Sequence, residues 1–155
     1  MVVPLPRFKK DTAGYWQAFE EAGHRRTGDE VALLFPLYVA ETEAEAQTVP
    51  RDSVMHYFDV LGQRMVAGDS ELAAATRERN QAMQTRLQQL TFEEVRQSVA
   101  IIGTPEYCIE RIQWLREEFQ LSELIRWFNP GGLIPHQTVL TSMSCFAAHI
   151  MPNFR

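Results

Sequence analysis

The chain has few of the residues that mark a disulfide framework or a metal centre. Its 155 residues include only two cysteines, Cys108 and Cys145, and they do not form a CxxC spacing. Both fall on apolar faces of expected helices, which predicts reduced core residues of a cytosolic protein. The four histidines lack the spacing of metal ligands, so we expect no metal site. These histidines are His24, His56, His136 and His149.

Long apolar runs are absent as well. The longest is VALLFPLYVA, residues 31–40, and it is too short to span a bilayer. The first ten residues hold three basic residues and two prolines, which does not match the apolar segment of a signal peptide. We therefore expect a cytoplasmic protein with no membrane partner.

Positive charge is scarce. The chain has 15 basic and 20 acidic residues, a net charge of −5, which argues against a general nucleic-acid partner. The sequence contains neither a Gly-x-Ser-x-Gly nor a Walker motif, so its catalytic residues stay unknown. An apolar fraction of 45% is nevertheless enough for the core of one domain.

Apolar runs alternate with amphipathic helices along the chain. Residues 2–5 look like the end of a buried strand, and residues 31–40 have the continuous apolar composition of a parallel strand covered on both faces. Leu124–Phe128 is the next expected strand, within residues 123–129. Pro36 cannot donate to a ladder, so we expect a bulge or an exposed edge there. A further short apolar run, residues 98–102, is not assigned to a strand. The alternation predicts a helix-rich α/β fold with about three parallel strands.

Capping residues predict where the helices begin. The expected caps are Asp11 or Thr12, Thr42, Thr91 and Thr104. Thr42 and Thr91 each begin a capping box. Thr104 is followed by a proline, which suits the first position of a helix. Residues 51–97 have a polar sequence that predicts helices, with a break at residues 68–70 and a thin apolar face.

Three segments together resemble one known family. They are FPLYVAETEAEA, IIGTPEYCIERI and LIRWFNPGGLIPHQTVLTSMSCFAAHIMP. In this order they resemble the C-terminal end of the luciferase-like flavin-dependent monooxygenases. The resemblance implies a partial (β/α)8 barrel containing about its last three βα units. Residues 1–155 would form a single C-terminal portion, with residues 50–97 as a helical insertion before the last strand.

The resemblance also implies a function. Relatives use reduced FMN, or F420 in some branches, and the FMN enzymes oxidise a small organic substrate with O2. The first five barrel units have no counterpart here, and in the family they supply most contacts to the flavin phosphate. We therefore expect weak or absent flavin binding by this chain alone. The alternative is a non-catalytic remnant or an assembly module that needs a partner chain to complete the barrel.

The turn after the last strand is the best candidate for a flavin contact. Chemistry in a barrel sits at the C-terminal ends of the strands. The candidate cofactor-binding residues are Phe128, Asn129, Gly131 and Gly132. The asparagine amide suits a ring heteroatom or a phosphate, and the glycines allow a close backbone approach. The other interpretation is a simple turn in which the asparagine bonds its own backbone.

Three parallel strands cannot close a barrel. Their open edges leave backbone groups unpaired, and one face of the sheet loses its apolar cover. We therefore expect a homo-oligomer, or a partner chain that completes the barrel.

Overall fold

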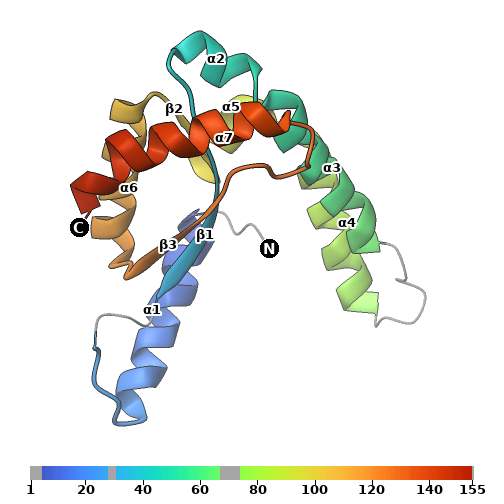
Figure 1. The fold of residues 1–155 in the computed structure, drawn as a ribbon. Coiled ribbons are helices and arrows are strands. Elements are labelled where there is room, and N and C mark those ends of the chain that lie inside the picture. The colour runs from blue at the N-terminus through green and yellow to red at the C-terminus, as the bar shows by residue number, and fades with distance from the viewer. Residues whose placement is uncertain (1–4, 28–30, 67–73, 155) are drawn as a thin grey trace.

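The computed structural model describes residues 5–27, 31–66 and 74–154. It is a helix-rich α/β structure with three parallel strands in one sheet, as the alternation of apolar runs predicted (Figure 1). The strands are β1 (Ala32–Val39), β2 (Ile101–Gly103) and β3 (Glu123–Trp127). The helices are α1 (Leu5–Glu21), α2 (Glu43–Thr48), α3 (Arg51–Val66), α4 (Ala74–Gln89), α5 (Phe92–Ser98), α6 (Pro105–Phe119) and α7 (His136–Cys145). None of the described helices is long and apolar enough to cross a membrane.

The identity of one strand differs from the prediction. Of the expected strand at residues 2–5, only Leu5 lies among the described residues, and it begins α1. The third strand is instead β2, formed where the sequence showed only a short apolar run. A strand of three residues is too short to show a periodic pattern. Near the N-terminus, proline is compatible with the first turn of a helix as well as with a strand.

The beginning of α1 also corrects the predicted cap. Asp11 and Thr12 lie inside the helix, and the Thr12 hydroxyl donates to the carbonyl oxygen of Phe8 at 2.6 Å. Thr42 and Thr91, in contrast, both form the expected capping boxes. The predicted break at 68–70 lies outside the described residues.

β1 is the central strand and pairs with a different neighbour along each half. Its first half pairs with β3 and its second, from Leu37, with β2. The amide of Ala40 donates to the carbonyl oxygen of Gly103 at 3.0 Å, so even-numbered residues of β1 direct their backbone groups toward β2. Pro36 faces this side just before β2 begins, and its missing N–H therefore breaks no ladder bond.

Strand order distinguishes this sheet from a closed barrel. In a barrel, each strand lies between the strands that precede and follow it. Here the order is β2-β1-β3, so β2 and β3 lie on opposite sides of β1 and do not pair with each other. The three strands therefore form an open sheet. The α3–α4 hairpin projects from it on one side, and α1 extends from its lower end (Figure 1).

Each face of the sheet has its own core. Phe35 and Leu37 pack on one face with residues of α1, α6 and the end of α7. Tyr38 packs on the other face with Phe58 of α3 and residues of α5. A fully buried side chain such as Phe58 contributes about 1.5–3 kcal/mol to folding. The two helical layers therefore hold the upper part of β1 from both sides.

The lower part of the second face has no such cover. Leu34 and Ile125 are partners in register on β1 and β3, so their side chains lie side by side on the same face. They are 47% and 46% exposed, respectively. The open sheet therefore presents an apolar patch where the α3–α4 hairpin does not reach.

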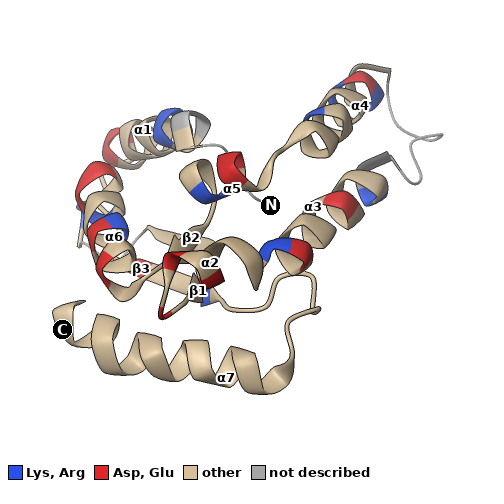
Figure 2. Ribbon diagram, turned by 90° about the horizontal axis from the view of Figure 1, so that it is seen from above, with Lys and Arg blue, Asp and Glu red and all other residues tan. Residues whose placement is uncertain are grey.

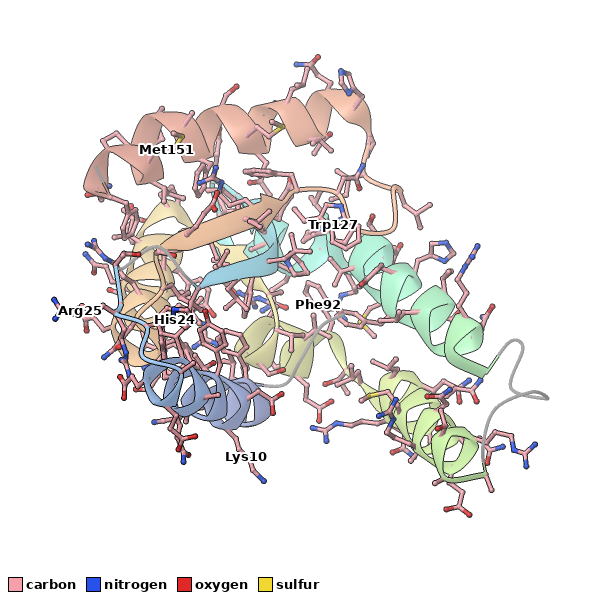
Figure 3. All side chains as sticks on the ribbon, turned by 90° about the horizontal axis from the view of Figure 1, so that it is seen from below. Lys10, His24, Arg25, Phe92, Trp127 and Met151 are labelled. Carbon is pink, nitrogen blue, oxygen red and sulfur yellow. The ribbon has the colours of Figure 1, made fainter. Side chains whose placement is uncertain are left out.

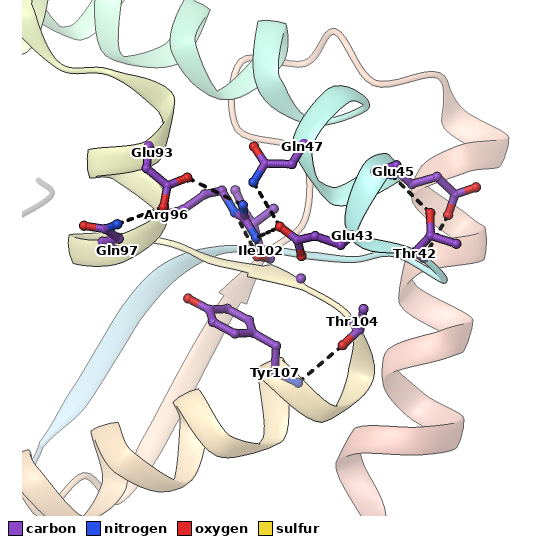
Figure 4. Close-up of polar contacts among 12 residues, drawn as sticks. Thr42, Glu43, Glu45, Gln47, Glu93, Arg96, Gln97, Ile102, Thr104 and Tyr107 are labelled. Atoms are coloured by element: carbon purple, nitrogen blue, oxygen red, sulfur yellow. Dashed lines mark hydrogen bonds and ion pairs between the residues drawn. The ribbon is translucent and has the colours of Figure 1, made fainter.

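Arg96 of α5 connects the helical insertion to the sheet (Figure 4). It is buried, and its Nε and Nη2 donate to the carbonyl oxygen of Ile102 at 3.2 and 3.1 Å. Nη2 also forms an ion pair with Glu43 of α2 at 2.8 Å, and Glu93 lies 3.7 Å from Nη1. One side chain thus ties α2 and α5 to the carboxyl end of β2.

Candidate functional site

The sequence-predicted site residues share one turn after β3, and Ser53 of α3 organises that turn. The Ser53 hydroxyl is buried and donates to the carbonyl oxygen of Pro130 at 2.6 Å, with the Asn129 Oδ1 at 3.1 Å. The amide of Leu133 donates to the same hydroxyl at 3.0 Å. Sequence reasoning missed Ser53, because a serine in the first turn of a helix has no distinguishing pattern.

Both ends of the Asn129 amide bond within the turn. Its Oδ1 accepts from the amide of Ile134 at 3.2 Å, and its Nδ2 donates to the carbonyl oxygen of Ile134 at 3.2 Å. The Asn129 carboxamide therefore satisfies both the N–H and the C=O of Ile134, as a neighbouring strand would. The turn is thus closed by its own side chain. Any ligand that bonds Asn129 must share or displace these contacts.

The two glycines have different surroundings. Gly131 and Gly132 both have positive φ, at +87° and +75°, which disfavours side chains. A Cβ on Gly131 would lie 1.9 Å from the backbone oxygen of Ser53, whereas one on Gly132 would meet nothing within 4 Å. The close approach at Gly131 is therefore to the protein itself. Only Gly132 leaves open space beside its backbone.

The aromatic residues around the turn pack inward. The Phe128 ring lies 5.7 Å from that of Phe146 in an edge-on arrangement. Trp127 points toward α3, with its ring 4.8 Å from that of Tyr57 (Figure 3). These contacts fix the end of β3 against helices on both of its sides.

A second feature lies at the carboxyl ends of β1 and β2. This is an open hollow of about 1060 Å³ between α6, α7 and the segment after β1, which we call the α7 hollow. Its polar lining consists mainly of Glu41, Glu106, Gln137, Ser144 and His149. Its position fits the rule that chemistry in this architecture follows the strand ends. Of the two strands that end at the hollow, only β1 was predicted from the sequence, so the hollow itself was not predicted.

Carboxylates dominate the charge of the α7 hollow. No lysine or arginine of the described residues lines it, and α7 carries no charged residue at all (Figure 2). Burial raises the pKa of the Cys145 thiol, and the charges of Glu41 and Glu106 raise it further. Two carboxylates of the hollow thus act on a thiol in its apolar wall, while His149 acts on Glu106 from the same lining.

The remaining reactive groups are isolated from one another. Cys108 is fully buried, and burial raises the pKa of its thiol to about 12. Within the described parts of the chain, no three His, Cys, Asp or Glu side chains gather where they could hold a metal ion.

Comparison with known proteins identifies the family. The family model of the luciferase-like monooxygenases matches residues 1–120. No protein with a curated description matches the chain. The solved structures that match include a monooxygenase from Streptomyces bottropensis, with a TM-score of 0.62 and 19% identity over 99% of this chain.

Another similar structure is a type II Baeyer–Villiger monooxygenase, the oxygenating constituent of 3,6-diketocamphane monooxygenase from the CAM plasmid of Pseudomonas putida, in complex with FMN. Its TM-score is 0.61, with 18% identity over 94% of this chain. The chain spans only 40% and 39% of the lengths of these two proteins. It belongs to the luciferase-like monooxygenase family.

Proposed function

We propose that this chain is the C-terminal portion, residues 1–155, of a flavin-dependent monooxygenase. With the rest of the barrel it would oxidise a small organic substrate, using reduced flavin and O2. The observation that carries the proposal is the match of the family model to residues 1–120. The likeness of the fold to an FMN-bound monooxygenase supports FMN as the cofactor, with F420 as the alternative.

The described residues do not by themselves fit the phosphate of a flavin. The Asn129 amide is bonded inside its turn, and Gly131 packs against Ser53. The α7 hollow offers carboxylates rather than cations, and a phosphate needs positive charge or free backbone amides. The proposed role of the turn is a contact with the flavin ring, through Phe128, Asn129, Gly131 and Gly132.

A complete site requires more polypeptide. The similar structures have about two and a half times the length of this chain, by the shares of 40% and 39% that it covers. The open edges and the exposed Leu34 and Ile125 are consistent with a partner chain or a second copy that supplies further strands. The free thiols of Cys108 and Cys145 favour a reducing compartment, so we place the protein in the cytoplasm.

Flavin titration tests the proposal. We expect weak quenching of FMN fluorescence by the purified chain, and a further decrease in affinity for Gly132→Asn, which fills the open space beside the turn. Asparagine tolerates the left-handed conformation, so this variant keeps the turn. The matched control is Gly23→Asn, the same exchange at a glycine after α1 that also has positive φ and open space around a Cβ. Tight FMN binding that both variants retain would place the flavin elsewhere.

The second candidate is a non-catalytic module of the same family. The closed hydrogen bonding of Asn129 favours it, because a residue already satisfied within the protein gains less from a ligand. This candidate predicts no FMN binding by the chain at any concentration, together with stable assembly in solution. Saturable binding with a shifted flavin absorption band would exclude it.

A further inference from the structure

The α7 hollow has one apolar wall and one polar rim. Ile109 of α6 and Leu140, Cys145 and Ala148 from α7 and the turn after it form the apolar wall. The volume of about 1060 Å³ of this open hollow is slightly above the range of about 300–1,000 Å³ for small-molecule sites. An organic molecule with an apolar body therefore has both room and a surface to pack against.

Most side chains of the polar rim are not hydrogen-bonded within the protein. Within residues 5–27, 31–66 and 74–154, the side chains of Glu41, Gln137, Ser144 and His149 make no hydrogen bond to another protein group. Glu106, in contrast, bonds Thr104 and its own backbone at the start of α6. Four exposed polar side chains, from the segment after β1, from α7 and from the turn after it, thus line one hollow without a hydrogen bond to another described protein group.

The geometry of α7 helps to form the rim. The helix continues into a π-helical turn, Phe146–Ile150, which widens the backbone where Ala148 and His149 reach the hollow. Single π-helical turns cost stability and recur at functional sites. Here the turn buries Phe146 and Ile150 in the core while the residues between them face outward.

Charge selects among ligands of the same shape. Glu41 and Glu106 give the hollow two carboxylates, and among the described residues no lysine or arginine lines it, although the imidazole of His149 lies close enough to lower the pKa of Glu106. A carboxylate, sulfonate or phosphate would be repelled, whereas a cation would gain from both carboxylates. We propose that the α7 hollow binds an organic cation with an apolar body, placed with its charge beside Glu41 and its body against Leu140 and Cys145.

Cys145 provides a reporter for such a ligand. It lines the hollow and is partly exposed, whereas Cys108, the other cysteine of the chain, is fully buried. Neutral iodoacetamide therefore alkylates Cys145 selectively, and a molecule seated against the wall slows that reaction. This binding does not require a flavin, so its outcome is independent of the flavin titration.

The experiment compares three probes of similar shape at constant ionic strength. They are benzyltrimethylammonium, benzyl alcohol and benzenesulfonate. We expect the cation to protect Cys145 at about fivefold lower concentration than the alcohol, the effect of one partly solvated ion pair, and the sulfonate to give no protection. Cys145→Ala should lose the alkylation altogether, which verifies the reporter.

A charge variant and a matched control decide the role of the rim. In Glu41→Gln the advantage of the cation over the alcohol should largely disappear. Glu117→Gln removes the same charge from an exposed position of α6 outside the hollow, and it should leave that advantage intact. Equal protection by cation and sulfonate, no protection by any probe, or equal loss in both variants would each overturn the proposal.

Discussion

At the scale of single residues, Ser53 and Gly131 approach each other closely in the turn after β3. The Ser53 hydroxyl bonds three groups of the turn, and its backbone oxygen lies where a side chain on Gly131 would begin. The neighbouring Gly132 shares the positive φ but has open space. Substitutions at the two glycines therefore distinguish the free-energy cost of a steric overlap, present only at Gly131, from the cost of a left-handed backbone, present at both.

Replacing each glycine by alanine should give different losses of stability. Gly132→Ala should cost about 1–2 kcal/mol, the penalty for a left-handed alanine. Gly131→Ala adds a steric overlap with Ser53 and should cost more than about 3 kcal/mol, because the turn must move. Urea unfolding followed by circular dichroism measures both. Equal losses would mean that the turn is free to shift away from α3.

The reactivity of Cys145 gives a second prediction at this scale. Burial is the main cause of its raised thiol pKa, and the charges of Glu41 and Glu106 add to it. Removing one charge in Glu41→Gln should lower the pKa of the thiol, increase the thiolate fraction at pH 8 and accelerate alkylation without any ligand. The acceleration should shrink in high salt, which screens the charge. An unchanged rate would show that Glu41 does not act on the thiol.

At the scale of elements, capping chemistry predicted more than hydrophobic pattern did. Thr42 and Thr91 were recognised because a capping box fixes two hydrogen bonds within four residues, and both are present. β2 and the role of Ser53 were not recognised, because their partners are distant in sequence. β2 pairs with β1, and Ser53 bonds a residue 77 positions later in the chain. The residues of the turn could be grouped from the sequence, but their bonding inside it could not.

Arg96 shows how a single side chain can hold several elements together, and it leads to a prediction about pH. Hydrogen bonding from Gln47 lowers the pKa of the Glu43 carboxyl, and Arg96 lowers it further. A depressed folded-state pKa stabilises the protein above the unfolded pKa, and this contribution is lost as the pH falls through the folded value. Stability should therefore fall on acidification below about pH 4.5, and less steeply in Glu43→Gln.

Urea midpoints between pH 7 and pH 3 measure this difference. Arg96→Met serves as the companion variant, because it leaves the buried carbonyl oxygen of Ile102 without its donor. It should destabilise the protein at every pH by about 1–3 kcal/mol. Parallel pH curves for Glu43→Gln and the wild type would show that the ion pair with Arg96 contributes nothing to folding.

At the scale of the whole molecule, the sheet is the incomplete element. Its three strands are covered by helices over the upper part of β1, while Leu34 and Ile125 remain exposed side by side. Isolated exposed aliphatic residues are ordinary, but a pair on an open sheet face marks a surface that another polypeptide can cover. The similar monooxygenases contain more than twice as much chain.

We therefore expect the purified chain to self-associate at micromolar concentration through this face. Ile125→Lys places a charge beside the exposed Leu34 and should shift the protein toward a monomer. Leu133→Lys makes the same exchange at a residue that is 55% exposed in the turn after β3, and it should leave assembly unchanged. Because each copy carries a net charge of −5, screening by salt should strengthen the association. Sedimentation velocity at two salt concentrations measures these effects. A compact monomer of the wild type at all concentrations would contradict self-association, and a loss of assembly in both variants would place the contact away from the sheet.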